Sequence, residues 1–277
     1  MKPYAFDYLA ANSAQEAVDL LAELGNDARI LAGGQSLMAV LNMRLAQPSA
    51  LIDISRTADL DYVRIEKGHM AVGAAATQAS VEWRADLADE VPLLAQAIPY
   101  ISHFQIRNRG TVCGSVAHAD PSAELPLVLV ALGGEVVLRN KKSRRSLKAQ
   151  EFFQGMLTTA RQPDELVEEV RFPLAKPGQK VAFLEFAARH GDFAMASVAA
   201  VAEGRRLRLA VGGVADRPVA REWEGLDESG FDDALNEFAW DLQAQDDHHA
   251  SAQFRRHLVR RLGKKTMKAV QAKEVQA

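Results

Sequence analysis

Two glycine-containing turns are the segments of this sequence whose residue types and spacing could do chemistry. The first turn, residues 31–37, has the sequence Leu-Ala-Gly-Gly-Gln-Ser-Leu and lies between an apolar run and a helical pattern. Adjacent glycines let main-chain N–H groups point into one concavity, and a following helix N-terminus adds partial positive charge. Both features favour phosphate binding, although the turn has no Walker lysine and does not match GxGxxG. A tight connection without a ligand would use the same residues.

The second turn, residues 109–115, has the sequence Arg-Gly-Thr-Val-Cys-Gly-Ser. Gly110 and Gly114 permit close approach of the backbone to a ligand, and Thr111 and Ser115 offer hydroxyl groups. If the two turns face each other, they could hold both halves of a pyrophosphate.

Three further side chains in and after the second turn could take part. Asp120 and Glu124 could accept hydrogen bonds from sugar or ribityl hydroxyl groups. Asp120 precedes Pro121, which is also typical of a turn residue, and Glu124 could instead cap the helix predicted there. Cys113 could be a reactive thiol, but a small buried residue is the interpretation that we expect.

Outside these two turns, the sequence offers little support for a catalytic or metal site. His248 and His249 could suggest a metal, but adjacent side chains point to different faces, so we expect exposed residues and no metal site. His103 and His118 have no nucleophile in a triad-like setting, and neither GxSxG nor HExxH occurs. A single cysteine, Cys113, excludes an internal disulfide and a cysteine-ligated zinc or iron–sulfur cluster built from this chain alone. We therefore predict no catalytic side chains.

Composition narrows the class of protein. The chain has 277 residues, 48% hydrophobic and 25% charged, which is typical of a globular protein and enough for one large or two ordinary domains. The net charge of −3 provides no basic field for nucleic acid or an anionic membrane surface. Neither a membrane-spanning run nor a secretory signal is expected, so we predict a cytoplasmic protein.

The elements that must position the two turns begin with a small α/β unit. Ser13 and Glu16 form a capping box before a helix that Gly25 ends. Strands are expected at 28–32 and 50–54, with a helix at about 37–45 between them. This alternation predicts a first subdomain over about residues 1–55.

A second subdomain is expected over about residues 56–175. We predict a hairpin from 62–65 and 70–74, helices after Thr77 and at 92–102 and 124–132, and strands at 134–138 and 166–172. Residues 104–121 are predicted to be irregular. Residues 175–179 combine turn residues with polarity and are the best linker candidate.

The C-terminal part, residues 178–277, is polarised by charge. Strands are expected at 195–201 and 207–211. Ten acids and no Lys or Arg lie between 222 and 247, and eight bases and no acid lie between 255 and 273. Such runs are typical of two solvated helices whose faces attract each other, and a docking surface for another subunit is the alternative.

Taken together, the two turns resemble the paired AGGxS and TxGGS signatures of the FAD-binding medium subunit of molybdenum hydroxylases, the xanthine dehydrogenase and carbon monoxide dehydrogenase family. The likeness covers nearly the whole chain. It includes further blocks in the same order, namely Phe6-Asp7-Tyr8, Ile106-Arg107-Asn108, His118-Ala119-Asp120-Pro121 and Arg189-His190-Gly191-Asp192-Phe193-Ala194.

The resemblance implies an α+β fold, with a two-subdomain PCMH-type FAD-binding domain (1–175) followed by a smaller α+β domain similar to the CO dehydrogenase flavoprotein C-terminal domain (178–277). Each glycine turn would then wrap the FAD pyrophosphate from one subdomain. The implied FAD-binding residues are Leu31, Ala32, Gly33, Gly34, Gln35, Ser36, Leu37, Ile101, Ile106, Thr111, Gly114, Ser115, His118, Asp120 and Glu124.

The resemblance also implies partners. Flavin supplies the redox chemistry, so few catalytic side chains are needed. A small subunit would carry two [2Fe-2S] clusters and a large subunit the molybdopterin cofactor, often in a dimer of heterotrimers. Electrons would pass from substrate hydroxylation at molybdenum, through the clusters, to FAD and on to an external acceptor.

Two positions depart from the family pattern. Cys113 replaces the first glycine of the TxGGS pair, and Leu184 stands where some relatives have a flavin-contacting lysine. Two other functions remain open: a self-sufficient FAD-dependent oxidase or dehydrogenase, and a scaffold subunit that has lost flavin. The sequence does not identify the substrate hydroxylated at molybdenum or the electron acceptor.

Overall fold

The computed structural model describes residues 2–272, so Met1, Lys273 of the basic run and residues 274–277 lie outside the described part. The first unit contains β1 (Asp7–Ala10), α1 (Ala14–Leu24), η1 (Gly25–Asp27), β2 (Ala28–Leu31), α2 (Leu37–Asn42) and β3 (Ala50–Asp53). The strands form a parallel sheet in the order β1-β3-β2. The small α/β unit with β2 and β3 was predicted from the sequence, but β1 was not. Ser13 caps α1, because its hydroxyl accepts a hydrogen bond from the Glu16 N–H at 3.1 Å.

The second unit packs helices against an antiparallel sheet. It contains η2 (Ala58–Leu60), β4 (Val63–Glu66), β5 (His69–Gly73), α3 (Gln78–Glu82), α4 (Leu87–Glu90), α5 (Pro92–Ala97), η3 (Ile98–Tyr100), α6 (Phe104–Arg107), α7 (Val112–His118), α8 (Glu124–Leu132), β6 (Glu135–Arg139), β7 (Arg144–Lys148), α9 (Ala149–Phe152), β8 (Phe153–Gly155), β9 (Thr158–Thr159) and β10 (Leu166–Pro173). The main sheet has the order β4-β5-β10-β6-β7. α8 is apolar around its circumference because it is enclosed between this unit and the C-terminal sheet.

The segment 104–121, predicted to be irregular, contains α6 and α7, so this prediction was wrong. Thr111 caps α7 by accepting a hydrogen bond from the Gly114 N–H at 3.0 Å. Val112, Cys113 and Val116 are buried beneath the helix. Tertiary packing therefore stabilises a helix that a short segment rich in small and polar residues would not form by propensity.

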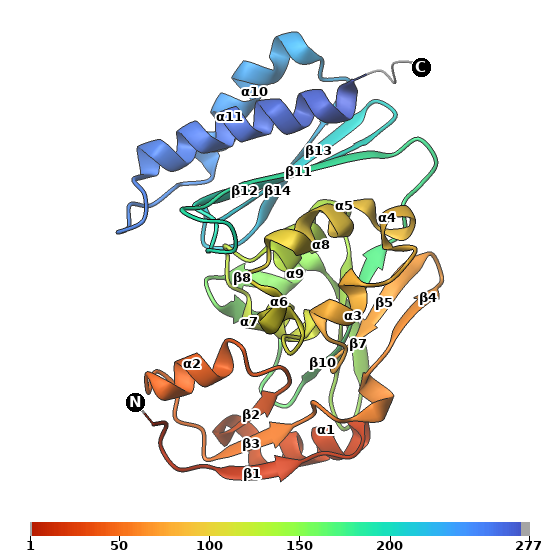
Figure 1. Cartoon of the computed structure of the whole chain (residues 1–277), viewed down its shortest axis with the longest axis vertical. Coiled ribbons are helices and arrows are strands. Elements are labelled where there is room, and N and C mark those ends of the chain that lie inside the picture. Colours follow the sequence, from red (N-terminus) through yellow and green to blue (C-terminus); the bar gives the residue numbers. More distant parts are fainter. Residues whose placement is uncertain (1, 273–277) are drawn as a thin grey trace.

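The C-terminal unit is an antiparallel sheet covered by two helices. It contains β11 (Lys180–Phe186), β12 (Ala196–Glu203), β13 (Arg206–Gly212), β14 (Val219–Glu224), η4 (Glu228–Gly230), α10 (Phe231–Asp241) and α11 (Ala252–Gln271). The sheet order follows the sequence. β12 and β13 were predicted from the sequence, whereas β11 and β14 were not. One sheet face packs on α5 and α8, and α10 and α11 cover the other (Figure 1). Phe183, Ala199 and Val201 thereby join the core of the second unit.

The polarised charges pair largely within the C-terminal unit. Lys264 of α11 contacts Asp232 of α10 at 2.7 Å, and Arg260 donates to the Asn236 side chain at 3.0 Å. Arg255 of α11 pairs with Asp247 at 2.6 Å. The interpretation that these segments attract each other is confirmed, except that the acidic run begins in a strand rather than a helix.

Two other expectations can be compared with the described residues. Cys113 is buried, its thiol donates to the Val72 carbonyl at 3.3 Å, and burial raises its pKa, which agrees with a packing role. His248 and His249 are both exposed. Within residues 2–272, no set of three His, Cys, Asp or Glu side chains is arranged to hold a metal ion. In the same range, helices that combine enough length and apolar character to cross a membrane do not occur.

Candidate functional site

A cavity of about 800 Å³ lies between the first and second units, and residues 191–193 of the C-terminal unit also line it. This volume is in the range of small-molecule and cofactor sites. All predicted site residues except Leu31 line the cavity: Ala32, Gly33, Gly34, Gln35, Ser36, Leu37, Ile101, Ile106, Thr111, Gly114, Ser115, His118, Asp120 and Glu124. Leu31 lies behind this wall, at the end of β2. The structure thus brings the two glycine turns together, as the sequence suggested.

The two turns touch through their backbones. A Cβ atom added to Gly33 would lie 2.7 Å from Cα of Gly110 and would also strike the Arg109 carbonyl oxygen. Gly34 has φ +72°, in the left-handed region that favours glycine. The Gln78 N–H donates to the Gly110 carbonyl at 2.7 Å and holds the second turn in place. Both glycines of the first turn are therefore required by geometry.

The first turn presents unused hydrogen-bond donors to the cavity. Among the hydrogen bonds of the described residues, none has an N–H of residues 33–37 as its donor, whereas the Met38 N–H already bonds to the Gly34 carbonyl. In the second turn the Gly114 N–H donates to the Thr111 hydroxyl, whereas the Cys113 N–H has no acceptor in the described part. Consecutive free N–H groups on a concave wall are suited to the oxygens of a diphosphate.

Gln78 is a cavity residue that the sequence analysis missed. Its side chain is only 5% exposed, yet its Oε1 atom has no hydrogen-bond partner in residues 2–272. A buried amide without a partner is unusual, and it lies on the cavity wall beside the contact between the two turns. Its amide can rotate to present either a donor or an acceptor. The only sequence signal was its place after the helix-capping Thr77.

Two acids form another part of the wall. Asp120 accepts a hydrogen bond from the Ser122 N–H at 2.9 Å, so it is a turn residue as well as a cavity residue. Glu124 is the first residue of α8 and is buried, and no side chain caps this helix. Burial, with a smaller contribution from Asp120, raises the pKa of Glu124 to about 7. The Glu124 carboxyl both lines the cavity and lies within hydrogen-bond reach of its own backbone N–H at the start of α8.

The C-terminal unit contributes a loop that the predicted site did not contain. Gly191, Asp192 and Phe193 line the cavity, and the Phe193 side chain remains exposed. Gly191 has φ +85° and packs so closely on the Ser102 carbonyl that an added Cβ would clash with it. Leu184, by contrast, packs into the core beneath α10 and α11, on the far side of β11. A contact from position 184 to the cavity is therefore excluded by the strand's orientation.

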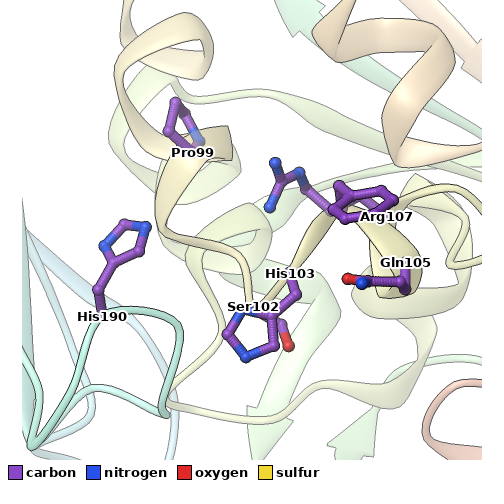
Figure 2. A pocket seen from close by; sticks show the side chains of 7 residues that line it. Pro99, Ser102, His103, Gln105, Arg107 and His190 are labelled. Carbon is purple, nitrogen blue, oxygen red and sulfur yellow. The ribbon is translucent and has the colours of Figure 1, made fainter.

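A second, smaller hollow of about 410 Å³ lies next to this loop. Figure 2 shows its side chains, with His190 on one side and Ser102, His103 and Arg107 on the other. Arg107 is already paired with Glu82 at 2.8 Å and donates to the Ile101 carbonyl at 2.8 Å. Its guanidinium thus fixes the backbone between the hollow and the large cavity.

Fold and site together define a class of protein that binds a nucleotide-type cofactor and has few reactive side chains of its own. Residues 4–175 match the family described as the FAD binding domain in molybdopterin dehydrogenase, and residues 181–270 match the CO dehydrogenase flavoprotein C-terminal domain.

Relatives share both parts of the chain. The nicotine 6-hydroxylase medium subunit of Paenarthrobacter nicotinovorans is 36% identical, covering 96% of this chain and 98% of its own. The glyceraldehyde dehydrogenase medium chain of Sulfolobus acidocaldarius is 35% identical, covering 98% and 100%. A chain of carbon monoxide dehydrogenase from Hydrogenophaga pseudoflava superposes with a TM-score of 0.92 at 30% identity, covering 98% of both chains. The protein therefore belongs to the family of FAD-binding medium subunits of molybdenum hydroxylases and is a subunit of an oxidoreductase.

Proposed function

We propose that this chain binds FAD non-covalently in the large cavity and relays electrons within a three-subunit molybdenum hydroxylase. Electrons would enter from [2Fe-2S] clusters on a small partner subunit and leave to an external acceptor. A large partner subunit would hold the molybdopterin cofactor and hydroxylate the substrate, in a cytoplasmic dimer of heterotrimers. The observation that carries the proposal is the backbone contact between two glycine turns beside a row of unused N–H donors.

The residues present fit FAD. The N–H groups of residues 33–37 would hold the diphosphate, and the orphaned Gln78 amide would gain a partner. Asp120 and Glu124 would accept hydrogen bonds from hydroxyl groups, while Ile101 and Ile106 would provide apolar contact. FAD would supply the redox chemistry, and this chain would bind it, orient it and exclude water from it. The Cys113 thiol is not available for covalent attachment, because it is buried and donates to the Val72 carbonyl.

The domain limits are part of the same proposal. We place the FAD-binding domain at residues 1–175, with subdomains divided near residue 55, and the C-terminal domain at 178–277. Two hydrophobic clusters support this division, because the cluster beneath α10 and α11 contains no residue from the first 175.

The proposed partner subunits would supply the iron–sulfur clusters and the molybdenum cofactor, for which this chain offers no ligands. Its single cysteine cannot ligate an iron–sulfur cluster alone, and the described residues contain no metal-ligand group. Relatives with this architecture are named as medium chains or subunits of dehydrogenases and hydroxylases. Clusters on a neighbouring chain would deliver electrons to the cofactor bound here.

Two measurements test the proposal. Purified chain should carry FAD that is released by acid precipitation, and Gly34→Val should abolish retention after desalting. Gly204→Val is the matched control, because Gly204 has φ +59° but lies in the turn between β12 and β13. Anaerobic stopped-flow absorbance should show no bleaching of the isolated flavoprotein by the complex's organic substrate until the other subunits are added. Rapid bleaching of the lone chain would show a self-sufficient flavoenzyme, and absence of flavin would show a scaffold.

A further inference from the structure

Ser102 lies in the wall that separates the large cavity from the smaller hollow, and it lines both. It lies between η3 and α6, and its φ of +43° is in the left-handed region of the backbone. A residue with a Cβ atom rarely adopts this conformation, because the Cβ atom then approaches the following carbonyl oxygen. Strain of this kind persists only where the surrounding structure holds it, and it is concentrated at ligand sites. Contacts around Ser102 must therefore hold the wall in this conformation.

Arg107, the last residue of α6, supplies one of these contacts. Its Nη1 atom donates a hydrogen bond of 2.8 Å to the Ile101 carbonyl, in the peptide that leads into Ser102. Its Nε and Nη2 atoms donate to the two carboxylate oxygens of Glu82, each at 2.8 Å. Both side chains are largely buried, with 11% of Arg107 and 15% of Glu82 exposed. A bidentate pair fixes the plane of the guanidinium, so the Ile101 carbonyl is held in one orientation.

The C-terminal unit holds Ser102 from another side. Gly191 packs so closely on it that an added Cβ would lie 2.8 Å from the Ser102 carbonyl oxygen and 3.2 Å from Cε1 of His103. The His103 carbonyl accepts from the N–H groups of Ile106 and Arg107 at 2.9 and 3.1 Å, which begins α6. The backbone is thus fixed before, at and after Ser102.

The conformation of Ser102 determines where two cavity residues lie. Ile101 precedes it, Ile106 belongs to the helix that follows, and both line the large cavity. A different φ at Ser102 would turn α6 relative to η3 and separate these two side chains. Together with Phe193 they form an apolar part of the cavity wall, distinct from the N–H donors of residues 33–37. An aromatic ring fits the apolar part, whereas a diphosphate fits the donors.

We propose that Ser102 and Arg107 are positioning residues for the flavin ring of FAD. Arg107, oriented by Glu82, holds Ser102 in its left-handed conformation, and this conformation places Ile101 and Ile106 against the ring. The inference rests on the FAD site proposed above and assigns to it the part of the wall that receives the ring.

The strain at Ser102 sets the size of the expected effect. For a residue with a Cβ atom, the left-handed conformation is disfavoured about fivefold to thirtyfold. Without the Arg107 contact, only a minor fraction of the free protein would have this wall in place, and the apparent FAD affinity would fall by up to the same factor. Glycine adopts positive and negative φ about equally, so at position 102 it would limit the loss to about twofold.

The test compares FAD with ADP-ribose, which has the same adenosine and diphosphate groups but no flavin ring. The double variant Glu82→Gln/Arg107→Met removes the ion pair without leaving a buried charge unpaired. Its FAD affinity, measured by flavin fluorescence, should fall about fivefold to thirtyfold, whereas its ADP-ribose affinity, measured by calorimetry, should stay within about twofold of the wild type.

The addition of Ser102→Gly to this double variant should restore FAD affinity to within about threefold of the wild type. Lys67→Gly is the matched control, because Lys67 also has a left-handed φ, +49°, but lies in the turn between β4 and β5. Its addition to the double variant should restore nothing.

Two single variants leave the ion pair intact. Ser102→Val should weaken FAD binding and alter the visible absorption spectrum of the bound flavin, because a β-branched residue strongly disfavours positive φ. Ser102→Gly alone should match the wild type in both measurements.

Equal losses of FAD and ADP-ribose affinity in the double variant would overturn the inference. A loss of FAD affinity that Ser102→Gly does not restore would overturn it as well, with the FAD site itself intact. Failure of the wild-type chain to bind FAD would instead refute the proposed function.

Discussion

Replacing Gly33 with alanine should separate the two turns that line the cavity. The new Cβ would lie 2.7 Å from Cα of Gly110 and 2.8 Å from the Arg109 carbonyl carbon, whereas ordinary contact begins at 3.4 Å. Both obstacles are backbone atoms, which cannot rotate away as a side chain can. The turns must therefore move apart by at least about 0.7 Å, the difference between 3.4 and 2.7 Å.

This displacement is enough to break hydrogen bonds to a diphosphate that spans both turns. A bond of about 2.9 Å would lengthen to roughly 3.6 Å, beyond the range in which a hydrogen bond forms. Hydrogen bonds to charged groups contribute roughly 1.5–3 kcal/mol each, so losing two costs about 3–6 kcal/mol. FAD affinity should fall by about a hundredfold to ten-thousandfold. The free energy of unfolding of the apoprotein should decrease by only about 1–3 kcal/mol.

The assay is a titration of apoprotein with FAD, followed by fluorescence, beside thermal unfolding of the same apoprotein. Gly134→Ala is the matched control, because its added Cβ would lie 2.6 Å from the Arg171 carbonyl, at the turn between α8 and β6. It should lower stability without changing FAD affinity. If Gly33→Ala bound FAD as tightly as the wild type while losing stability like Gly134→Ala, the turn would be only a tight connection.

Three further predictions concern single side chains. Glu124→Ala should weaken FAD binding about tenfold to a hundredfold without lowering apoprotein thermal stability, as calorimetry would show, because burial disfavours this carboxylate in the folded state. A loss of stability alone would indicate helix capping. Gln78→Glu should weaken FAD about tenfold or more by adding a carboxylate to the diphosphate wall, with Gln78→Met as the uncharged comparison in the same titration. Cys113 should resist alkylation in the native protein and react after denaturation, which mass spectrometry can follow, because burial raises its pKa.

The glycine turns could be predicted from the sequence, because glycines at these positions allow a tight turn whose N–H groups can face a ligand. Gly33 and Gly34 lie between a strand and a helix, and in the structure they form part of one wall of the cavity. Gln78 could not be found in this way. Its burial beside Gly110 depends on how two distant segments pack, and no local pattern distinguishes it from an exposed glutamine.

The sequence also did not show which faces of β11 its side chains occupy. β11 was not predicted, so the faces of Leu184 and Glu185 could not be assigned from the sequence. In the structure, Leu184 packs beneath α10 and α11, while Glu185 faces the FAD-binding domain. Successive residues of a strand point to opposite faces, so a difference of one position exchanges core and site. The sequence therefore could not show that Leu184 packs on the face of β11 that carries α10 and α11.

The large cavity takes its walls from parts of the chain that are far apart in sequence. Residues 33–37 come from the first unit, residues 110–115 from the second, and residues 191–193 from the C-terminal unit. A ligand that binds only this assembled arrangement stabilises all three parts by mass action. Among the described residues, Gln78 lines this cavity and has a buried side-chain oxygen without a hydrogen-bond partner. The unpartnered Gln78 amide therefore lies where the two glycine turns meet, at a point where a bound cofactor could supply the missing hydrogen bond.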